Sequence, residues 1–312
     1  MENLVLSFQV VLPLFLNIAL GYFLRCIGLI EEATQKSMNR LCFRVFLPIY
    51  LFSNVYNTNL TAVFDPGLIA FAVGGVLAVF LIMMLLIPRI EPDNAKRGVM
   101  VQAIFRSNFV LFGLPVVTSL CGEDHIGPTS LLIGFVVPVF NVLAVICLEY
   151  FRGGKPDVRK MLRGIASNPL IIASVLGIVM NLLGIPLPAG VSRSVTDLGR
   201  VATPLSLVVL GAGFQFGSIR GYTRQLALCI PLKLVAVPLV MLTLGALQGY
   251  RGDTLVPILA IFGAPIAVSS YTMAEQMDGD GMLAASLVVL TTAFSILTMF
   301  LFIFALKQLG LV

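Results

Sequence analysis

The sequence predicts an all-α polytopic membrane protein whose ten transmembrane helices form two inverted five-helix repeats. Three observations predict this fold. Ten apolar stretches fill the chain, a segment of the first half matches one of the second half, and the fourth and ninth stretches each contain a Gly-x-Pro triplet. Of the 312 residues, 58% are hydrophobic and only 11% are charged, whereas soluble domains carry about 25% charged residues. We therefore expect almost the whole chain to lie in a bilayer.

The ten predicted spans follow from length, because a helix needs roughly 20 apolar residues to cross the hydrocarbon core. They cover residues 4–24, 36–56, 66–88, 98–120, 127–150, 162–184, 195–217, 223–247, 254–276 and 281–307. The connections between them are short, so little of the chain remains for a separate soluble domain.

The distribution of basic residues predicts the topology. Arg193 and Arg251 are exceptions, but the other loop cations follow the first, third, fifth and seventh spans: Arg25, Lys36, Arg40, Arg89, Lys96, Arg97, Arg152, Lys155, Arg159, Lys160, Arg220 and Arg224. The positive-inside rule places such loops in the cytoplasm and both termini outside it. Membrane topology thus accounts for the net charge of +5 without a nucleic-acid partner. The pattern is typical of a protein of the bacterial inner membrane.

An internal repeat predicts how the spans are arranged. Residues 13–51 align without a gap on residues 169–207, an offset of 156, and the matches include Pro13 with Pro169 and Gly21 with Gly177. The first repeat then covers residues 1–151, a short cytoplasmic linker covers 152–161, and the second repeat covers 162–312. Because each unit has five spans, the second enters the membrane from the opposite side.

The fourth and ninth spans contain Gly113-Leu114-Pro115 and Gly263-Ala264-Pro265. Proline removes a backbone donor and kinks or ends a helix. Within a bilayer such a break is tolerated where it lines a polar cavity, and paired breaks in two halves indicate a transport site. A helix that restarts after each proline would present a partially positive N-terminus. Two such ends facing one cavity favour an anionic substrate that carries a carboxylate.

Polar residues flank both predicted breaks. Asn108 is a substrate-binding candidate, with contact between helices as the alternative. Ser269 and Ser270 are also candidates, although small hydroxyl residues often serve close helix packing. For Arg106 two interpretations are open, because it either binds a second carboxylate or extends to the cytoplasmic interface.

Two further charged residues are candidates for charge compensation or coupling. Lys233 lies deep in the eighth span, where a structural ion pair or contacts with helix carbonyls are the alternatives to a functional role. Glu275, near the cytoplasmic end of the ninth span, is a candidate partner of Lys233 or a proton carrier. No cluster of acidic residues indicates a sodium site, so the coupling ion stays open.

The sequence contains none of the catalytic or metal-binding motifs that would indicate an enzyme. His125 is the only histidine, the five cysteines form no C-x-x-C pair, and neither G-x-S-x-G nor H-E-x-x-H occurs. A metal cluster needs several ligands in a defined spacing. A His-based triad needs its histidine beside a nucleophile, whereas His125 falls in a short loop between two predicted spans. We therefore expect no enzymatic activity, no cofactor and no metal site.

The broken spans resemble those of the auxin efflux carrier family, which includes plant auxin exporters and bacterial permeases for malate- or malonate-like acids. The resemblance lies in N-F-V-L-F-G-L-P (residues 108–115), P-I-A-V-S-S-Y-T-M-A-E-Q-M (265–277), L-E-Y-F-R-G-G (148–154) and K-L-V-A-V-P (233–238). It implies the fold of the sodium–proton antiporters and bile-acid symporters. Spans 1, 2, 6 and 7 would form a scaffold that dimerises, and spans 3–5 and 8–10 a transport domain that moves as an elevator.

The same resemblance implies substrate contacts at Asn108, at the breaks with Gly113, Pro115 and Pro265, and less directly at Ser53, Asn54 and Asn141. Asn141 stands where the plant exporters have an aromatic residue, and their long central loop is absent. A polar residue there suits a compact acid such as malate or malonate better than an indole. The alternatives are a sodium-coupled symporter of larger amphipathic anions and a non-transporting membrane sensor.

Overall fold

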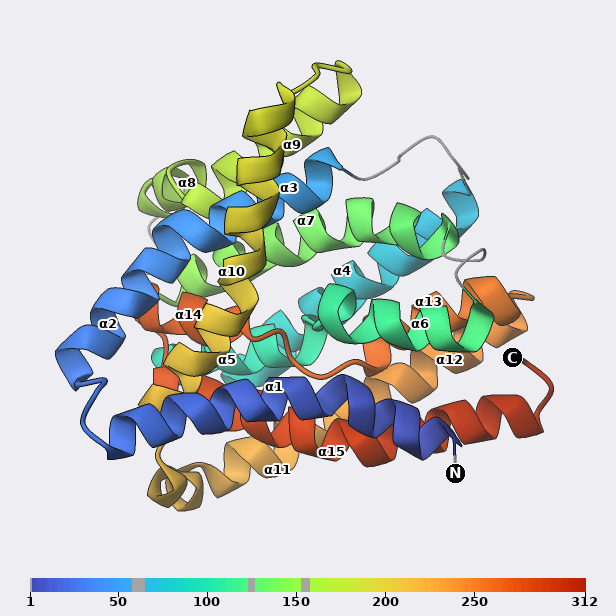
Figure 1. Cartoon of the computed structure of the whole chain (residues 1–312). Helices are drawn as coiled ribbons and strands as arrows, with labels where there is room; N and C mark the ends of the chain where they lie inside the picture. The colour runs from blue at the N-terminus through green and yellow to red at the C-terminus, as the bar shows by residue number, and fades with distance from the viewer. Residues whose placement is uncertain (1, 58–64, 123–126, 153–157) are drawn as a thin grey trace.

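The computed structural model describes residues 2–57, 65–122, 127–152 and 158–312 (Figure 1). Within these residues the backbone forms helices and their connections and no strand. His125 and Lys155, with the rest of linker segment 153–157, lie outside the described residues. The all-helical, polytopic class predicted from the sequence is confirmed.

Helices occupy all ten predicted spans. The first half forms α1 (Glu2–Cys26), α2 (Glu32–Leu41), η1 (Cys42–Phe46), α3 (Leu47–Tyr56), α4 (Pro66–Ile90), α5 (Asn94–Phe105), η2 (Phe109–Gly113), α6 (Leu114–Cys121) and α7 (Gly127–Phe151). The second half forms α8 (Val158–Ala166), α9 (Pro169–Leu182), α10 (Ala189–Gly213), η4 (Phe216–Tyr222), α11 (Thr223–Pro231), η5 (Leu232–Ala236), α12 (Val237–Leu247), α13 (Gly252–Gly263), α14 (Ser269–Gln276) and α15 (Gly281–Gln308).

Five helical segments are long and apolar enough to cross a membrane by themselves: Pro66–Ile90, Gly127–Phe151, Ala189–Gly213, Ile219–Leu247 and Gly281–Gln308. The bent pair Asn94–Leu111 and Pro115–Cys121 makes a sixth if it counts as one span. The other predicted spans contain shorter or more charged helices. By length and composition the described residues thus contain five or six candidate spans, whereas the full set of ten inverted spans stays a prediction.

Three π-helical turns allow the chain to pass a proline without leaving the helix. The turns η1, η2 and η5 end two residues before Pro48, Pro115 and Pro238, respectively. An i→i+5 turn widens the helix, which relieves the clash and the missing donor that proline brings to a regular helix. As a result α2, η1 and α3 run on as one helix, and so do α11, η5 and α12.

The helices form two packed groups. In the first group α1 packs on α10, α10 on α3, and α3 on α9 (Figure 1). The second group contains α4, α5, α7, α12, α13 and α15, and α1 and α10 also contact its α15. In Figure 1 the start of α1 and the C-terminal end of α15 both lie on the right, and the connection from α1 to α2 lies on the left.

Glycines bring the helix backbones of the first group into contact. A Cβ added to Gly21 of α1 would lie 2.0 Å from the carbonyl oxygen of Val208 in α10, and one added to Gly211 would lie 2.0 Å from that of Ile18. A Cβ on Gly177 of α9 would lie 3.1 Å from the carbonyl oxygen of Phe52 in α3. Small residues permit such approaches between membrane helices, where apolar burial drives association only weakly. Gly21 and Gly177, matched by the sequence repeat, thus occupy equivalent packing positions.

Connections that carry basic residues meet at one end of the molecule. The guanidinium of Arg152, after α7, donates to Asp278 between α14 and α15 at 2.7 Å. Arg224 at the start of α11 donates to the carbonyl oxygen of Ile90 at the end of α4 at 3.0 Å. The loops that the charge pattern assigns to one side of the membrane are therefore neighbours in space.

We expect Gly21→Ala to destabilise the protein by about 2–3 kcal/mol, because the added methyl group must push two helix backbones apart. The control is Gly74→Ala in α4, where an added Cβ meets nothing within 4 Å. That change should be neutral or stabilising, since alanine has the higher helix propensity by about 1 kcal/mol. Thermal unfolding of the detergent-purified variants measures the difference, and equal melting temperatures would contradict the packing described for α1 and α10.

Candidate functional site

Two non-helical segments cross in the interior of the protein. After α5 the chain leaves the helix at Arg106, Ser107 and Asn108, and after α13 it leaves the helix from residue 264 to residue 268. The backbone N–H of Asn108 donates to the carbonyl oxygen of Pro265 at 2.8 Å. Both breaks therefore satisfy part of their backbone through each other, which a bilayer requires of any chain that leaves a helix.

The first break lies earlier in the chain than the Gly113-Leu114-Pro115 triplet suggests. At the triplet the chain stays helical, because η2 leads directly into α6 and Pro115 occupies the first turn of that helix. Proline is tolerated there, since its missing N–H would have no partner in any case. The axis still bends by 56° between Asn94–Leu111 and Pro115–Cys121. The second break begins at Ala264, as the sequence predicts.

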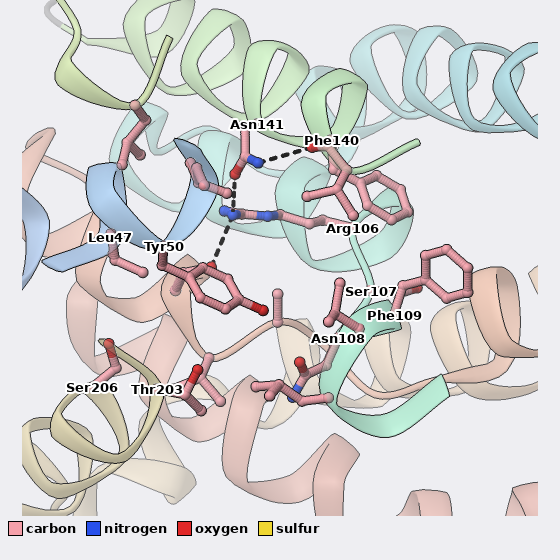
Figure 2. A pocket seen from close by; sticks show the side chains of 18 residues that line it. Leu47, Tyr50, Arg106, Ser107, Asn108, Phe109, Phe140, Asn141, Thr203 and Ser206 are labelled. Carbon is pink, nitrogen blue, oxygen red and sulfur yellow. Dashed lines mark hydrogen bonds between the residues drawn. The ribbon is translucent and has the colours of Figure 1, made fainter. Parts of the chain in front are cut away.

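A cavity of about 60 Å³ lies where the two breaks cross (Figure 2). A water molecule needs roughly 10–15 Å³ by this measure, so the cavity has room for a few atoms of a small molecule. Its walls come from α3, both breaks, η2, α7, α9, α10 and the start of α14: Leu47, Tyr50, Leu51, Arg106, Ser107, Asn108, Phe109, Val110, Leu111, Val137, Phe140, Asn141, Leu170, Thr203, Ser206, Ala267, Val268 and Ser269.

Arg106 is the only cation among the cavity-lining residues. Its side chain is 4% exposed, so it does not extend to the membrane interface. The guanidinium donates to Asn141 Oδ1 at 2.6 Å, to Ser269 Oγ at 2.8 Å and to the Met273 sulfur at 2.7 Å. In the described part of the chain no carboxylate forms a salt bridge with it. A buried cation with only neutral partners is an attractive site for an anion.

The side chain of Asn108 also lines the cavity and is buried. Its Nδ2 group has no hydrogen-bond partner in the described residues. Buried polar groups are normally satisfied, and an unsatisfied donor costs about 1–3 kcal/mol. Asn108 thus presents to the cavity a donor that a bound acceptor such as a carboxylate oxygen would satisfy.

Lys233 lies behind the cavity wall. It belongs to η5, is fully buried, and donates through Nζ to the hydroxyl of Ser107, which itself lines the cavity. Glu275, the candidate partner of Lys233, does not contact it; this half-buried carboxylate lies near the far end of α14 and against Gly281. The structure therefore joins Lys233 to the first break rather than to an acidic residue.

Of the other predicted site residues, Asn141 and Ser269 line the cavity and hold the Arg106 guanidinium, and the carbonyl of Pro265 holds the first break. The remaining candidates are not among the lining residues: Ser53, Asn54, Gly113, Pro115 and Ser270. Ser53 and Ser270 are buried near the site, whereas Pro115 is exposed. The structure thus brings together Arg106, Asn108, Asn141 and Ser269 out of the predicted set.

Sequence reasoning missed three polar residues of the cavity. Tyr50 of α3 and Thr203 and Ser206 of α10 form the wall opposite the breaks (Figure 2). The internal repeat could have indicated them, because its offset of 156 relates Tyr50 to Ser206 and Leu47 to Thr203. Both members of each pair line the cavity.

Comparison with known proteins places this architecture among membrane transporters. The family described as "Membrane transport protein" matches residues 6–303. An uncharacterised transporter of Methanothermobacter thermautotrophicus is 25% identical over 296 residues, which cover 94% of this chain and 96% of the relative. A putative malonate transporter of Rhizobium meliloti is 21% identical, with 92% of each chain covered. A probable auxin efflux carrier component of Oryza sativa is 29% identical over 42% of this chain and 37% of the relative.

The two asparagines of the cavity should differ in their effect on stability. Asn141→Ala removes an acceptor of the buried Arg106 guanidinium, so we expect a loss of about 1.5–3 kcal/mol. Asn108→Ala removes an amide nitrogen that has no partner, so the ligand-free protein should lose much less. Thermal unfolding in detergent without added acids measures both variants, and a larger loss for Asn108→Ala would contradict the described hydrogen bonding.

Proposed function

Because the chain belongs to the membrane transport protein family, we propose that it is a secondary carrier for a small organic anion. The observation that carries this proposal is the buried guanidinium of Arg106, which lines the central cavity and has only neutral hydrogen-bond partners. A carboxylate bound there would complete a charge-assisted pair. The unsatisfied amide of Asn108, two residues further along the same break, supports the same assignment.

The proposed substrates are short mono- or dicarboxylates such as malonate or malate. The cavity of about 60 Å³ is small, and its walls combine a cation, two amides and hydroxyl groups that suit a compact polar acid. The relative in Rhizobium meliloti that is named a putative malonate transporter supports this choice. We assign the substrate contacts to Arg106, Asn108, Asn141 and Ser269.

We further propose an elevator movement. The scaffold would consist of α1, the continuous helix from α2 to α3, α8, α9 and α10, and would form the interface of a homodimer. The transport domain would consist of α4–α7 and the segment from η4 to α15. The position of the cavity supports this division, because Arg106 and Asn108 face it from one group and Tyr50 and Ser206 from the other.

The inverted repeat and the membrane orientation belong to the same proposal. The equivalent packing of Gly21 and Gly177 and the paired cavity positions Tyr50 and Ser206 support the repeat of residues 1–151 and 162–312. The end at which Arg152 and Arg224 join neighbouring loops would face the cytoplasm, since basic loops are retained there. Both termini would then lie outside, in the inner membrane of a bacterium.

Counterflow of radiolabelled malonate into proteoliposomes preloaded with unlabelled malonate tests the function. Wild-type protein should accumulate label, and Arg106→Gln should raise the half-saturating concentration by at least about 30-fold. That factor corresponds to about 2 kcal/mol, the lower limit for removing one partner of a buried charge pair. Arg106→Lys keeps the charge but loses the planar arrangement of donors, so its half-saturating concentration should lie between those of the wild type and Arg106→Gln.

Unchanged counterflow in Arg106→Gln would contradict the assigned site. Saturable malonate binding without any flux would favour a membrane sensor. Flux that requires sodium and prefers larger amphipathic anions would favour the symporter alternative.

For Asn108→Ala we expect a 5- to 30-fold weaker affinity for malonate, because one hydrogen bond to a charged acceptor is worth about 1–2 kcal/mol here. Isothermal titration of the purified protein measures this change directly. Thr118→Ala, on α6 outside the cavity lining, provides the matched control, and its affinity should equal that of the wild type. An unchanged affinity in Asn108→Ala would remove this residue from the site.

A further inference from the structure

Two buried cations lie at the first break without an acidic counterpart. Arg106 contacts Asn141, Ser269 and Met273, and Lys233 contacts Ser107. Arg106 is 4% exposed and Lys233 is 0% exposed. All of these partners are neutral, so the charge of the site is not balanced by its own hydrogen bonds.

In the described part of the chain, no carboxylate forms a salt bridge with Arg106 or Lys233. Residues 94–122, 127–148, 223–252 and 254–274, which contain both breaks, α7 up to Leu148 and Lys233, include no Asp or Glu. Glu149 and Asp278 instead pair with Arg152 at the loop end of the molecule. Asp280 caps α15 through the N–H of Leu283 and accepts from the hydroxyl of Tyr222.

An alternating-access carrier must pass through a closed state in which water is excluded from its site. An uncompensated cation is costly in such a state, because neutral dipoles replace only part of its hydration. A bound carboxylate removes that cost for the loaded carrier. The empty carrier has no such compensation, so its return across the membrane is opposed by the same two charges that attract the substrate.

We propose that this protein is an obligate anion exchanger, which crosses the membrane rapidly only when an anion occupies the cavity. This inference rests on the proposed carrier function and specifies its mode. The transported anion leaves on one side, and a second organic anion must bind to the same site before the carrier returns. Net movement of the acid without a counter-anion is correspondingly slow.

Efflux of radiolabelled malonate from loaded proteoliposomes tests the mode of transport. The external medium contains either unlabelled malonate or a bulky sulfonate buffer without chloride, and potassium with valinomycin clamps the membrane potential in both cases. We expect exchange to be at least tenfold faster than net efflux, which is 1.4 kcal/mol of difference in barrier. Equal rates under the clamp would overturn obligate exchange while leaving the carrier function intact. Absence of malonate movement in both media would overturn the proposed function together with this inference.

A double variant tests whether the buried charge is the cause. Ser107→Ala with Lys233→Met removes donor and acceptor together, so that no unsatisfied polar group remains. The ratio of exchange to net efflux should fall at least threefold, because the empty carrier then carries one buried cation fewer. Arg193→Gln is the matched control, since its side chain is 87% exposed, and its ratio should equal that of the wild type. An unchanged ratio in a folded double variant would overturn the charge explanation. If the double variant does not fold, the wild-type comparison still decides the mode.

Discussion

The crossing of two non-helical segments inside a bundle of helices is the constraint on which the other features depend. A chain that leaves its helix within a bilayer must find partners for its backbone groups elsewhere in the protein. Here the N–H of Asn108 finds the carbonyl of Pro265, and the N–H of Ile266 lies 3.3 Å from the hydroxyl of Thr291. Because the two breaks hold each other, both sets of adjoining side chains face one cavity. This geometry places the buried guanidinium of Arg106 and the unsatisfied amide of Asn108 beside the same cavity.

Around the crossing, single turns and single glycines keep the helices continuous and let them pack closely. The π-turns let Pro48, Pro115 and Pro238 be accommodated in helices, and the glycines of α1, α9 and α10 let backbones touch. These devices keep the surrounding helices regular, so irregular backbone at membrane depth is concentrated where the cavity lies. Continuous helices around a centre of interrupted helices are typical of carriers with interrupted spans.

Composition and patterning were sufficient to predict the helical class, the second break and the cavity residues Arg106, Asn108 and Ser269, because each depends on local chemistry, whereas Asn141 was implied only by the family resemblance. The position of the first break was not predictable in this way. Pro115 suggests an interruption, but the π-turn before it depends on how α6 packs against its neighbours, which no local pattern records. Tyr50 and Ser206 were missed because single polar residues in an apolar span are common, and only their relation through the repeat distinguishes them.

The cavity has unlike walls at positions that the repeat relates to each other. Tyr50 contributes a bulky ring on α3, whereas Ser206 contributes a small hydroxyl on α10. If the two repeats had the same residue at each pair of equivalent positions, both ends of a bound molecule would meet identical surroundings. The divergence at this pair of positions removes that equivalence, so even a molecule with two identical ends would meet a different environment at each. In the proposed inverted repeat, this difference would distinguish the two orientations of a guest.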